Sequence, residues 1–392
     1  MKQLLRSYPF ECFVAFACLV VLVIETINER LWMNDFKVYY FAAQHLIGDG
    51  QVYGQPFGLG SGFFKYSPFA ALCFVPVSQL PYEIAKHVHY VLSSVATICM
   101  FLLLKQLFRE AYKAAPKQFN WMLVGILAVN SPQLFRELHL GNVNMMLLLL
   151  NLLALLRLPK QPYVAGSLIG LCLLFKPHFV LLLPLLVLHK QIKALVACTA
   201  AIGVGLLLPA VLIGWSQNLQ LLTEWMQAIR QHNDSLDSAR DNLAYIIQYY
   251  TVHNQSIDLY KQLAIGVLAG FILLMGIVRF RHWQIERNGS SILAWQHLKI
   301  EAYILLASIP TLLITDTEHF LLSIPLITFL VLNALHYRLR KPLYLLMLFV
   351  ALALFWGSDF VSDNAMLGMG NALLLLLIAG HESLSEQLSS SS

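Results

Sequence analysis

The chain has 392 residues, of which 58% are hydrophobic and only 12% are charged, and its mean hydropathy is +0.66. Soluble domains carry about 25% charged residues, so this composition argues against a soluble protein and predicts a polytopic membrane protein. The net charge of +5 comes from basic residues scattered between apolar segments, which is typical of membrane topology signals and not of a nucleic-acid-binding surface. The six cysteines lie in apolar runs without a Cys-x-x-Cys pair, so we expect neither disulfides nor a cysteine metal site.

Apolar runs recur along the whole sequence and predict an all-α bundle of about twelve spans. They cover residues 8–26, 84–108, 119–135, 143–157, 163–175, 177–189, 193–213, 260–280, 299–315, 319–336, 342–357 and 364–380. Several are shorter than the ~20 residues that a straight span needs, so we expect these to be tilted or partly enclosed by protein. No small-residue cleavage site follows the first run, which we therefore expect to be a retained helix. The interpretation is a single transmembrane domain over residues 1–380, followed by a disordered cytoplasmic tail at 381–392.

The run 163–188 decides the topology, because it fits either one long helix or a hairpin broken at Lys176-Pro177. With the hairpin, most of the 26 Lys and Arg residues fall in loops on the side of the two termini, including the basic cluster at 338–341. A single helix would place that cluster outside, against the positive-inside bias. The hairpin is therefore favoured. Both termini are then cytoplasmic, and residues 27–83 and 214–258 form two outer loops.

The first outer loop contains a candidate acid and a candidate cation. Asn34 fits a helix cap, which places Asp35 in the first turn of a short amphipathic helix on the membrane surface. An acid at this position is often only a capping residue. Lys65, between two aromatic residues, fits a snorkelling interfacial lysine equally well. In the second outer loop, residues 215–229 have an amphipathic pattern.

Polar residues near the ends of later spans complete the set of candidates on the outer face. Lys176 lies between two apolar runs, where a charge is costly unless it is paired or faces water, although exposure at the tip of a hairpin would also explain it. Arg136 and Glu137 join two spans and can simply pair with each other. Asn144 heads an apolar run, where its amide needs a partner.

Asp316, Glu318 and His319 form another outer tip. A histidine at the end of a span is usually interfacial, but two acids beside it favour a binding role. We expect no metal ion there, because no second histidine lies at ligand spacing. The sequence contains no P-loop, dinucleotide-binding glycine pattern, G-x-S-x-G or H-E-x-x-H, which argues against nucleotide hydrolysis as an energy source.

Several short motifs follow one another in a distinctive order along nearly the whole chain. They are Asp35-x3-Tyr39-Tyr40-x-Ala42-Ala43, Leu46 with Gly50 and Tyr53, Phe64-x-Tyr66-x-Pro68, Leu80-Pro81, Gly141-x-Val143-Asn144, Gly166-x3-Gly170-Leu171-x4-Lys176-Pro177 and the outer-tip His319. This order resembles glycosyltransferase family 87 of the GT-C superfamily, the polyprenyl-phosphate-mannose-dependent α-mannosyltransferases of bacterial envelopes. The chain departs from the family at Asn142, where Gln is usual, and at residues 315–318, where the family has Ser-Pro and a Trp before the His.

The resemblance implies a GT-C-type helical bundle with juxtamembrane helices in the first outer loop and Asp35 as the general base. Transfer from a glycosyl phosphate needs a base for the acceptor hydroxyl and cations for the departing phosphate. The candidates for phosphate binding are Lys65, Lys176, Arg136 and His319. The candidates for substrate binding are Tyr39, Tyr40, Tyr66, Asn144 and Glu318.

We therefore expect inverting transfer of a hexose, by resemblance mannose, from a polyprenyl-phosphate sugar to an envelope glycan or glycolipid. The expected partners are this donor, the acceptor and membrane lipids, with no nucleic acid, no metal and no cofactor besides the lipid-linked co-substrate. The expected location is the bacterial cytoplasmic (inner) membrane, with the active site on the periplasmic side.

A secondary transporter or lipid flippase is the alternative, because broken spans and a lysine within an apolar segment suit it as well. Against it, no inverted repeat is visible, and the charged residues gather on one face instead of at the bilayer midplane. A non-catalytic envelope assembly factor is a third interpretation, and it would not need an ionised Asp35.

Overall fold

The secondary structure of the computed structural model is mainly helical in the residues that it describes. These are residues 7–58, 62–233, 240–252, 256–286, 291–313, 316–336, 342–356 and 365–379. Among them the one β interaction is an isolated bridge between Pro56 and Phe63, so the predicted all-α fold class is confirmed. The basic cluster at 338–341, Thr315 and the predicted tail at 381–392 lie outside the described residues.

The chain divides into two compact units, and each is assembled from segments that are distant in sequence. The first unit comprises Met1–Asn120, Leu134–Val180 and Lys190–Asp234. The second comprises Trp121–Gln133, Leu181–His189 and Ser235–Ser392. The single transmembrane domain over 1–380 stays a prediction.

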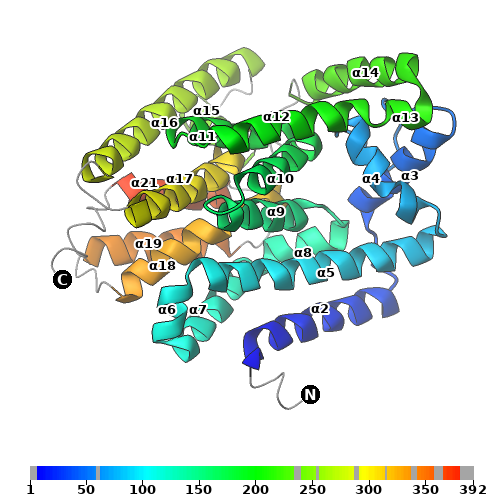
Figure 1. Ribbon diagram of the computed structural model, residues 1–392. Helices are drawn as coiled ribbons and strands as arrows, with labels where there is room; N and C mark the ends of the chain where they lie inside the picture. Colours follow the sequence, from blue (N-terminus) through cyan, green and yellow to red (C-terminus); the bar gives the residue numbers. More distant parts are fainter. Residues whose placement is uncertain are drawn as a thin grey trace. The chain divides into compact units, whose positions relative to one another are not determined.

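In the first unit, helix α10 packs against both α9 and α12, α5 packs against α2 and α9, and α3 packs against α4 (Figure 1). The helices that lie wholly in this unit are α2 (Pro9–Ile27), α3 (Asn34–Ile47), α4 (Pro68–Ser78), α5 (Tyr82–Leu107), α6 (Arg109–Ala114), α9 (Asn144–Arg157), α10 (Pro162–Phe175), α12 (Ile192–Leu207), α13 (Ala210–Ile213) and α14 (Trp215–Asn233). The first outer loop therefore contains two helices, α3 and α4. The amphipathic segment 215–229 lies within α14.

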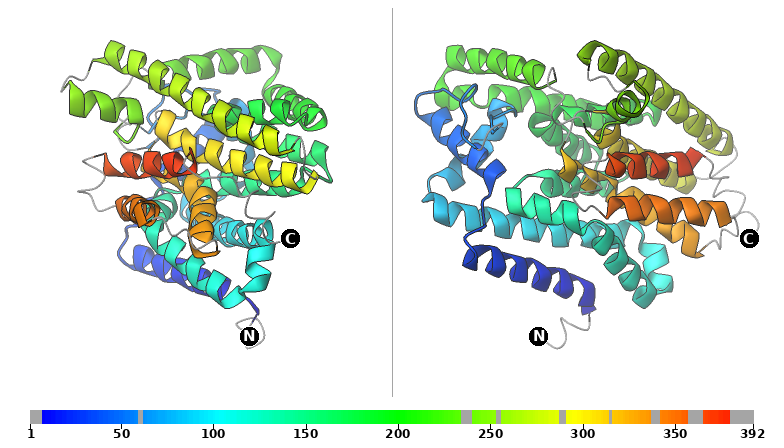
Figure 2. Two further views of the ribbon diagram at one scale, coloured as in Figure 1. Left: turned by 90° about the vertical axis from the view of Figure 1, so that its left-hand side faces the viewer. Right: turned by 180° about the vertical axis from the view of Figure 1, so that it is seen from behind.

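In the second unit, α17 contacts α16 and α21, and α19 packs against α21 (Figure 2). Its elements are α11 (Leu183–Leu188), α15 (Leu243–Thr251), α16 (Ile257–Glu286), α17 (Ser291–Leu312), the 3-10 helix η2 (Thr317–Ser323), α18 (Ile324–His336), α19 (Pro342–Phe355) and α21 (Met366–Ala379). Three further elements are shared between the units, namely α7 (Pro116–Val129), α8 (Ser131–Leu140) and the 3-10 helix η1 (Pro177–Leu182).

Five of the described helical segments are long and apolar enough to cross a membrane. They are Pro9–Ile27, Tyr82–Leu107, Ile192–Ile213, Ile257–Gln284 and Thr317–Leu335. A sixth span results if α8 and α9, which are bent by 114° relative to each other, are counted together. The count of about twelve spans stays a prediction.

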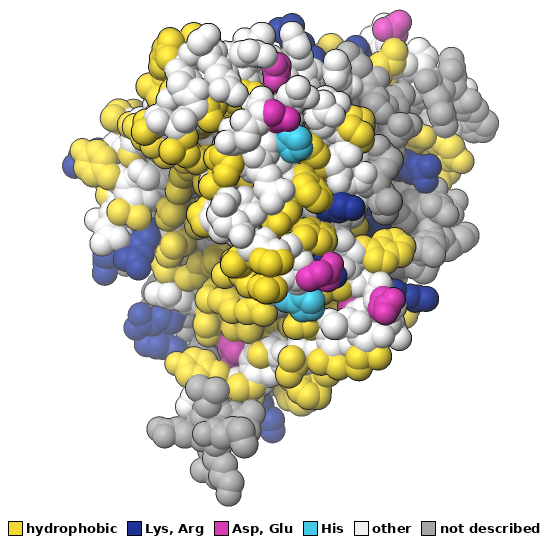
Figure 3. All heavy atoms as spheres, turned by 90° about the vertical axis from the view of Figure 1, so that its right-hand side faces the viewer, with side chains coloured by type: hydrophobic (Ala, Val, Ile, Leu, Met, Phe, Trp, Pro, Cys, Tyr) yellow, Lys and Arg dark blue, Asp and Glu magenta, His cyan; other side chains and the backbone are white. Residues whose placement is uncertain are grey.

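Large apolar side chains are exposed along these helices, for example Phe16 on α2, Val204 on α12 and Ile265 on α16. Figure 3 shows broad hydrophobic areas on one face of the molecule, with few acidic side chains among them. Apolar areas of this extent are unusual on soluble monomers and fit contact with lipid tails.

Two of the apolar runs are interrupted by polar residues and proline. The run 119–135 is not one helix, because α7 ends at Val129 and α8 begins at Ser131, with Pro132 in the first turn of the new helix, where proline is tolerated. The run 163–188 breaks where the sequence predicts. Lys176 is extended, with φ −132° and ψ 104°, because the following Pro177 disfavours the helical conformation in the residue before it.

Two glycines on α10 allow it to approach α12 closely. A Cβ added at Gly166 would lie 1.9 Å from the carbonyl oxygen of Ala194, and one at Gly170 would lie 2.7 Å from that of Cys198. Small residues four positions apart permit this kind of backbone contact between membrane helices. The contact fixes α10, at whose C-terminal end Lys176 lies.

We expect Gly166→Ala to destabilise the protein by about 1–3 kcal/mol, because the new methyl group must displace the backbone of α12. The matched control is Gly203→Ala on α12, where an added Cβ meets nothing within 4 Å. This control should be neutral or slightly stabilising, because alanine favours a helix over glycine. Thermal unfolding in one detergent measures both variants, and equal midpoints would contradict the close contact.

Candidate active site

Asp35 lies in the first turn of α3, where the helix dipole favours its ionised form. The residue that precedes the helix is Met33, in a left-handed conformation with φ 47°, so Asn34 is the first helical residue instead of the cap. The Met33 backbone N–H donates a hydrogen bond to the carbonyl oxygen of His139 at 3.0 Å, which ties the start of α3 to the end of α8. Asp35 is half-buried.

Asn142 connects Asp35 with Lys176. Its Nδ2 donates to Asp35 Oδ2 at 2.7 Å, and its Oδ1 accepts from Lys176 Nζ at 3.1 Å. The same Oδ1 accepts from the Val143 backbone N–H at 2.7 Å and from the Tyr39 hydroxyl at 3.4 Å. An amide that must offer its nitrogen to an acid and its oxygen to a cation has one orientation, so these partners fix the side chain.

The turn that carries Asn142 is compact because of Gly141. This glycine adopts φ 70°, and an added Cβ would lie 2.8 Å from Cβ of Phe36 on α3. Its carbonyl oxygen lies 2.9 Å from His89 Nε2 on α5. A residue with a side chain would be strained here and would also push α3 away, so Gly141 is what brings Asn142 to Asp35.

Lys176 is buried, with 2% of its surface exposed, so the alternative of a lysine exposed at a hairpin tip is wrong. Its ammonium donates to Asn142 and also to Asn144 Oδ1, at 2.7 Å. The ring of Tyr66 lies 5.5 Å from Nζ, measured to the ring centroid. Amide oxygens and an aromatic face thus replace the water that a buried ammonium loses.

Glu137 holds Asn144 in place. It is fully buried, and its Oε2 accepts from Asn144 Nδ2 at 2.9 Å while its Oε1 accepts from the Met145 backbone N–H at 2.8 Å. The carboxylate therefore lies at the N-terminus of α9, where negative charge is favoured. Glu137 points into the protein whereas Arg136 is exposed on α8.

Tyr39 and Tyr66, which both lie within residues 27–83, extend the network beyond Asp35. Their hydroxyl oxygens are 3.1 Å apart. Burial, followed by the nearby Tyr66 and Asp35, raises the pKa of Tyr39 well above its ordinary value, so this hydroxyl stays protonated and can donate. Tyr40 lies outside the network, because its hydroxyl donates to the Leu80 carbonyl oxygen at 2.8 Å.

The remaining predicted cations are placed differently. The Lys65 carbonyl oxygen accepts from Trp225 Nε1 at 3.1 Å, and its ammonium makes no hydrogen bond or ion pair with the described residues. His319 and Glu318 are buried in η2 of the second unit. Their ligand atoms and that of Asp316 lie within 4.8 Å of one another, a spacing that suits a cation. The phosphate- and substrate-binding roles of Lys65, Arg136, His319 and Glu318 stay predictions.

The sequence reasoning missed two residues of the network, Asn142 and Glu137. Asn142 stood out only as a departure from the family pattern, and Glu137 only as a partner for its neighbour Arg136. The available signal was a cluster of three polar residues, Glu137, Asn142 and Asn144, between two apolar runs. A buried cation requires acceptors, and such a cluster could supply them.

A family model described as glycosyltransferase family 87 matches residues 63–308, which include Asn142, Asn144 and Lys176 but neither Asp35 nor His319. An alpha-(1->3)-arabinofuranosyltransferase of Corynebacterium glutamicum is 23% identical over 256 residues. That alignment covers 64% of this chain and 57% of the relative, so the chain spans little more than half of that protein's length.

No solved structure matches the chain. The family match covers more than half of the chain, and the described residues include several helices long and apolar enough to cross a membrane. The chain belongs to glycosyltransferase family 87.

Proposed function

We propose that the protein transfers a sugar from a polyprenyl-phosphate donor to an envelope glycan or glycolipid, with Asp35 as the general base. The observation that carries this proposal is the Asp35–Asn142–Lys176 network, in which one amide joins the carboxylate of the half-buried Asp35 to a buried cation. Family membership supports sugar transfer over the transporter interpretation.

Each group has a defined role in the proposed reaction. The acceptor hydroxyl oxygen attacks the anomeric carbon while its proton passes to Asp35, and the bond to the phosphate oxygen breaks with its electron pair on the phosphate. The positive charge of Lys176 stabilises the negative charge that develops on the departing phosphate. A direct displacement inverts the anomeric carbon, so a β-linked donor would give an α-linked product.

The burial of Lys176 specifies how it acts. With 2% of its surface exposed, the ammonium acts through its field and through the two amides that it orients. A charge in a water-poor environment is screened weakly, so its effect on a nearby phosphate is larger than that of a surface lysine. Metal ions and other cofactors have no part in the proposal, and the donor itself supplies the leaving group.

The proposed location is the bacterial inner membrane, with Asp35 on the periplasmic side and both termini in the cytoplasm. The distribution of Lys and Arg between the loops supports this orientation. A polyprenyl-phosphate sugar stays in the membrane through its lipid tail, so it suits a site beside membrane helices.

Asp35→Asn should lower the transfer rate by about 10²–10⁴-fold, because the amide cannot take the proton of the acceptor hydroxyl. The assay uses the purified protein in lipid, a polyprenyl-phosphate sugar and candidate acceptors. The matched control is Glu83→Gln, which changes an acid in the first turn of α5 whose side chain is 73% exposed. The control should leave the rate unchanged. Transfer at the wild-type rate by the Asp35→Asn variant would refute the role of Asp35 as the general base.

Lys176→Gln should lower kcat by about 10²-fold, because it removes the buried positive charge and a donor to both amides. Lys193→Gln, at an exposed lysine in α12, is the control and should be silent. Thermal unfolding of both variants separates a loss of activity from a loss of folding. A folded Lys176→Gln protein with an unchanged kcat would remove Lys176 from the mechanism.

The proposed sugar is mannose, as the family resemblance implies, and the name of the relative makes a pentofuranose the second candidate. Polyprenyl-phosphate mannose and polyprenyl-phosphate arabinofuranose should be supplied separately to the wild-type protein, with product identified by mass spectrometry. We expect transfer from the mannose donor. Transfer from the arabinofuranose donor alone would overturn the choice of sugar and leave the reaction class standing.

A further inference from the structure

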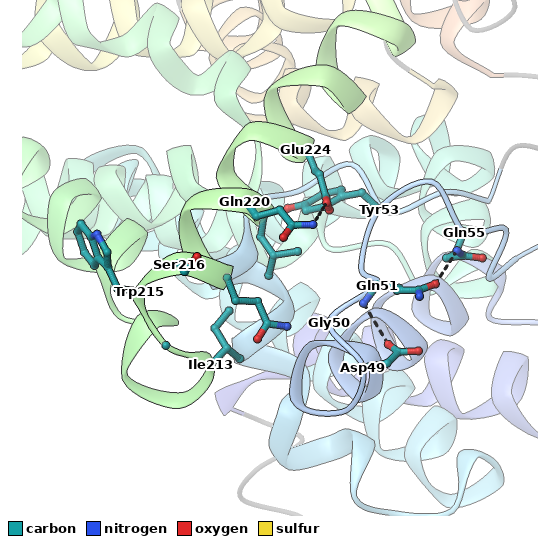
Figure 4. A pocket seen from close by; sticks show the side chains of 13 residues that line it. Asp49, Gly50, Gln51, Tyr53, Gln55, Ile213, Trp215, Ser216, Gln220 and Glu224 are labelled. Atoms are coloured by element: carbon teal, nitrogen blue, oxygen red, sulfur yellow. Dashed lines mark hydrogen bonds between the residues drawn. The ribbon is translucent and has the colours of Figure 1, made fainter.

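A polar pocket of about 740 Å³ lies in the first unit, between the loop that follows α3 and the segment from α13 to α14 (Figure 4). It is lined by Asp49, Gly50, Gln51, Tyr53, Gln55, Ile213, Gly214, Trp215, Ser216, Gln217, Gln220, Leu221 and Glu224. Its size lies within the range of about 300–1,000 Å³ that is usual for small-molecule sites. None of the residues of the Asp35–Asn142–Lys176 network lines it.

The lining has the chemistry of a site for a neutral polyol. Four side-chain amides, two hydroxyls and two carboxylates offer both donors and acceptors, as the hydroxyl groups of a sugar require. None of the described residues that line the pocket is Lys, Arg or His. The Gln51 backbone N–H and His45 hold the pKa of Asp49 below its ordinary value, so this carboxylate is ionised at neutral pH. A phosphate would meet two carboxylates and no basic side chain among the lining residues.

Several lining side chains already hold one another in position. Gln220 Nε2 donates to Glu224 Oε1 at 2.8 Å, and Gln55 Nε2 donates to Gln51 Oε1 at 3.2 Å (Figure 4). Side chains that are fixed before binding lose less entropy when a ligand arrives. Tyr53 adds aromatic surface of the kind on which the apolar face of a sugar ring can pack.

Tyr53 links this pocket with the candidate active site. Its hydroxyl donates to the Tyr66 carbonyl oxygen at 2.7 Å, and the Tyr66 hydroxyl in turn lies 3.1 Å from that of Tyr39. The Trp225 hydrogen bond to Lys65 fixes α14 to the same segment. Tyr53, which lines the pocket, thus contacts the backbone of Tyr66, whose side chain reaches the Asp35 network through Tyr39.

We propose that this pocket binds the neutral glycan part of the acceptor and holds it while its terminal hydroxyl reaches Asp35. The proposal rests on the proposed function and assigns to this pocket the substrate whose chemistry its lining suits. The donor phosphate is excluded from the pocket by the two carboxylates, Asp49 and Glu224.

The test measures binding, because binding does not require transfer. The probes are the methyl glycosides of an α-linked mannose disaccharide and of an α-linked arabinofuranose disaccharide, with farnesyl phosphate as an anionic donor analogue. The proteins are wild type, the double variant Gln51→Ala/Gln220→Ala and the control Gln227→Ala, an exposed glutamine of α14 that does not line the pocket. All are full chains in lipid nanodiscs, with thermal unfolding as a check on folding.

We expect the double variant to bind one disaccharide at least tenfold more weakly than wild type, as the loss of two hydrogen bonds implies. The control should bind like wild type, and farnesyl phosphate binding should be equal in all three proteins. Equal disaccharide binding by the three proteins, or no binding of either disaccharide to wild type, overturns the proposal. Weaker binding of farnesyl phosphate alone by the double variant overturns it as well and assigns the pocket to an anion.

Failure of the proposed function has a different signature. If wild type binds a disaccharide through Gln51 and Gln220 but transfers no sugar from any polyprenyl-phosphate donor, the pocket is a glycan site and the transfer reaction is wrong. If transfer depends on Asp35 but the double variant binds the disaccharides as tightly as wild type does, the proposed reaction stands and the acceptor binds elsewhere.

Discussion

The candidate site depends on one side-chain amide. Asn142 donates to the Asp35 carboxylate and accepts from the Lys176 ammonium, so one amide forms hydrogen bonds with an anion and with a buried cation at the same time. Burying an ammonium costs free energy unless oxygen atoms replace the water molecules that hydrate it. A carboxylate is held in one orientation only if the group that donates a hydrogen bond to it is itself fixed. An amide solves both problems because it carries a donor and an acceptor in one plane. A carboxylate at position 142 would offer no donor to Asp35, and an alkyl group would offer neither.

The side chains of the candidate site are positioned by the ends of helices. Gly141 ends α8 with a positive φ, Pro177 ends α10 one residue after Lys176, and Met33 enters α3 in a left-handed conformation. Each break leaves backbone groups without helical partners, and polar side chains of the site fill some of these positions. Glu137, for example, accepts from the backbone N–H of Met145 in the first turn of α9 while it orients Asn144. The same residues thus satisfy the broken backbone and build the site.

The sequence predicts those parts that follow from local rules. The break at Lys176-Pro177 follows from the steric restriction that proline places on the residue before it, and the helix at Asp35 follows from its apolar spacing. The start of that helix is displaced by one residue, because the cap position is set by the tertiary hydrogen bond from Met33 to His139. Tyr40 was a candidate for substrate binding, yet its hydroxyl is used in packing α3 against the residues after α4. Its spacing along the helix does not distinguish it from Tyr39.

Long-range contacts account for the rest. Asn142 lies 107 residues from Asp35 and 34 from Lys176 in the chain, so no local pattern joins them. The polar pocket has the same origin, because its two walls are separated by more than half of the first unit's sequence. Polar side chains on an amphipathic helix such as α14 look alike in sequence whether they face water or a ligand.

The close contact between α10 and α12 sets a rule for how this part of the chain can vary. Gly166 anchors one end of α10 against Ala194, and Lys176 must point to Asn142 from the other end. One residue inserted or deleted between them would rotate the lysine by about 100° around the helix axis. Side chains on the less buried side of α10 are therefore freer to change in size and type than the number of residues between the glycine and the lysine.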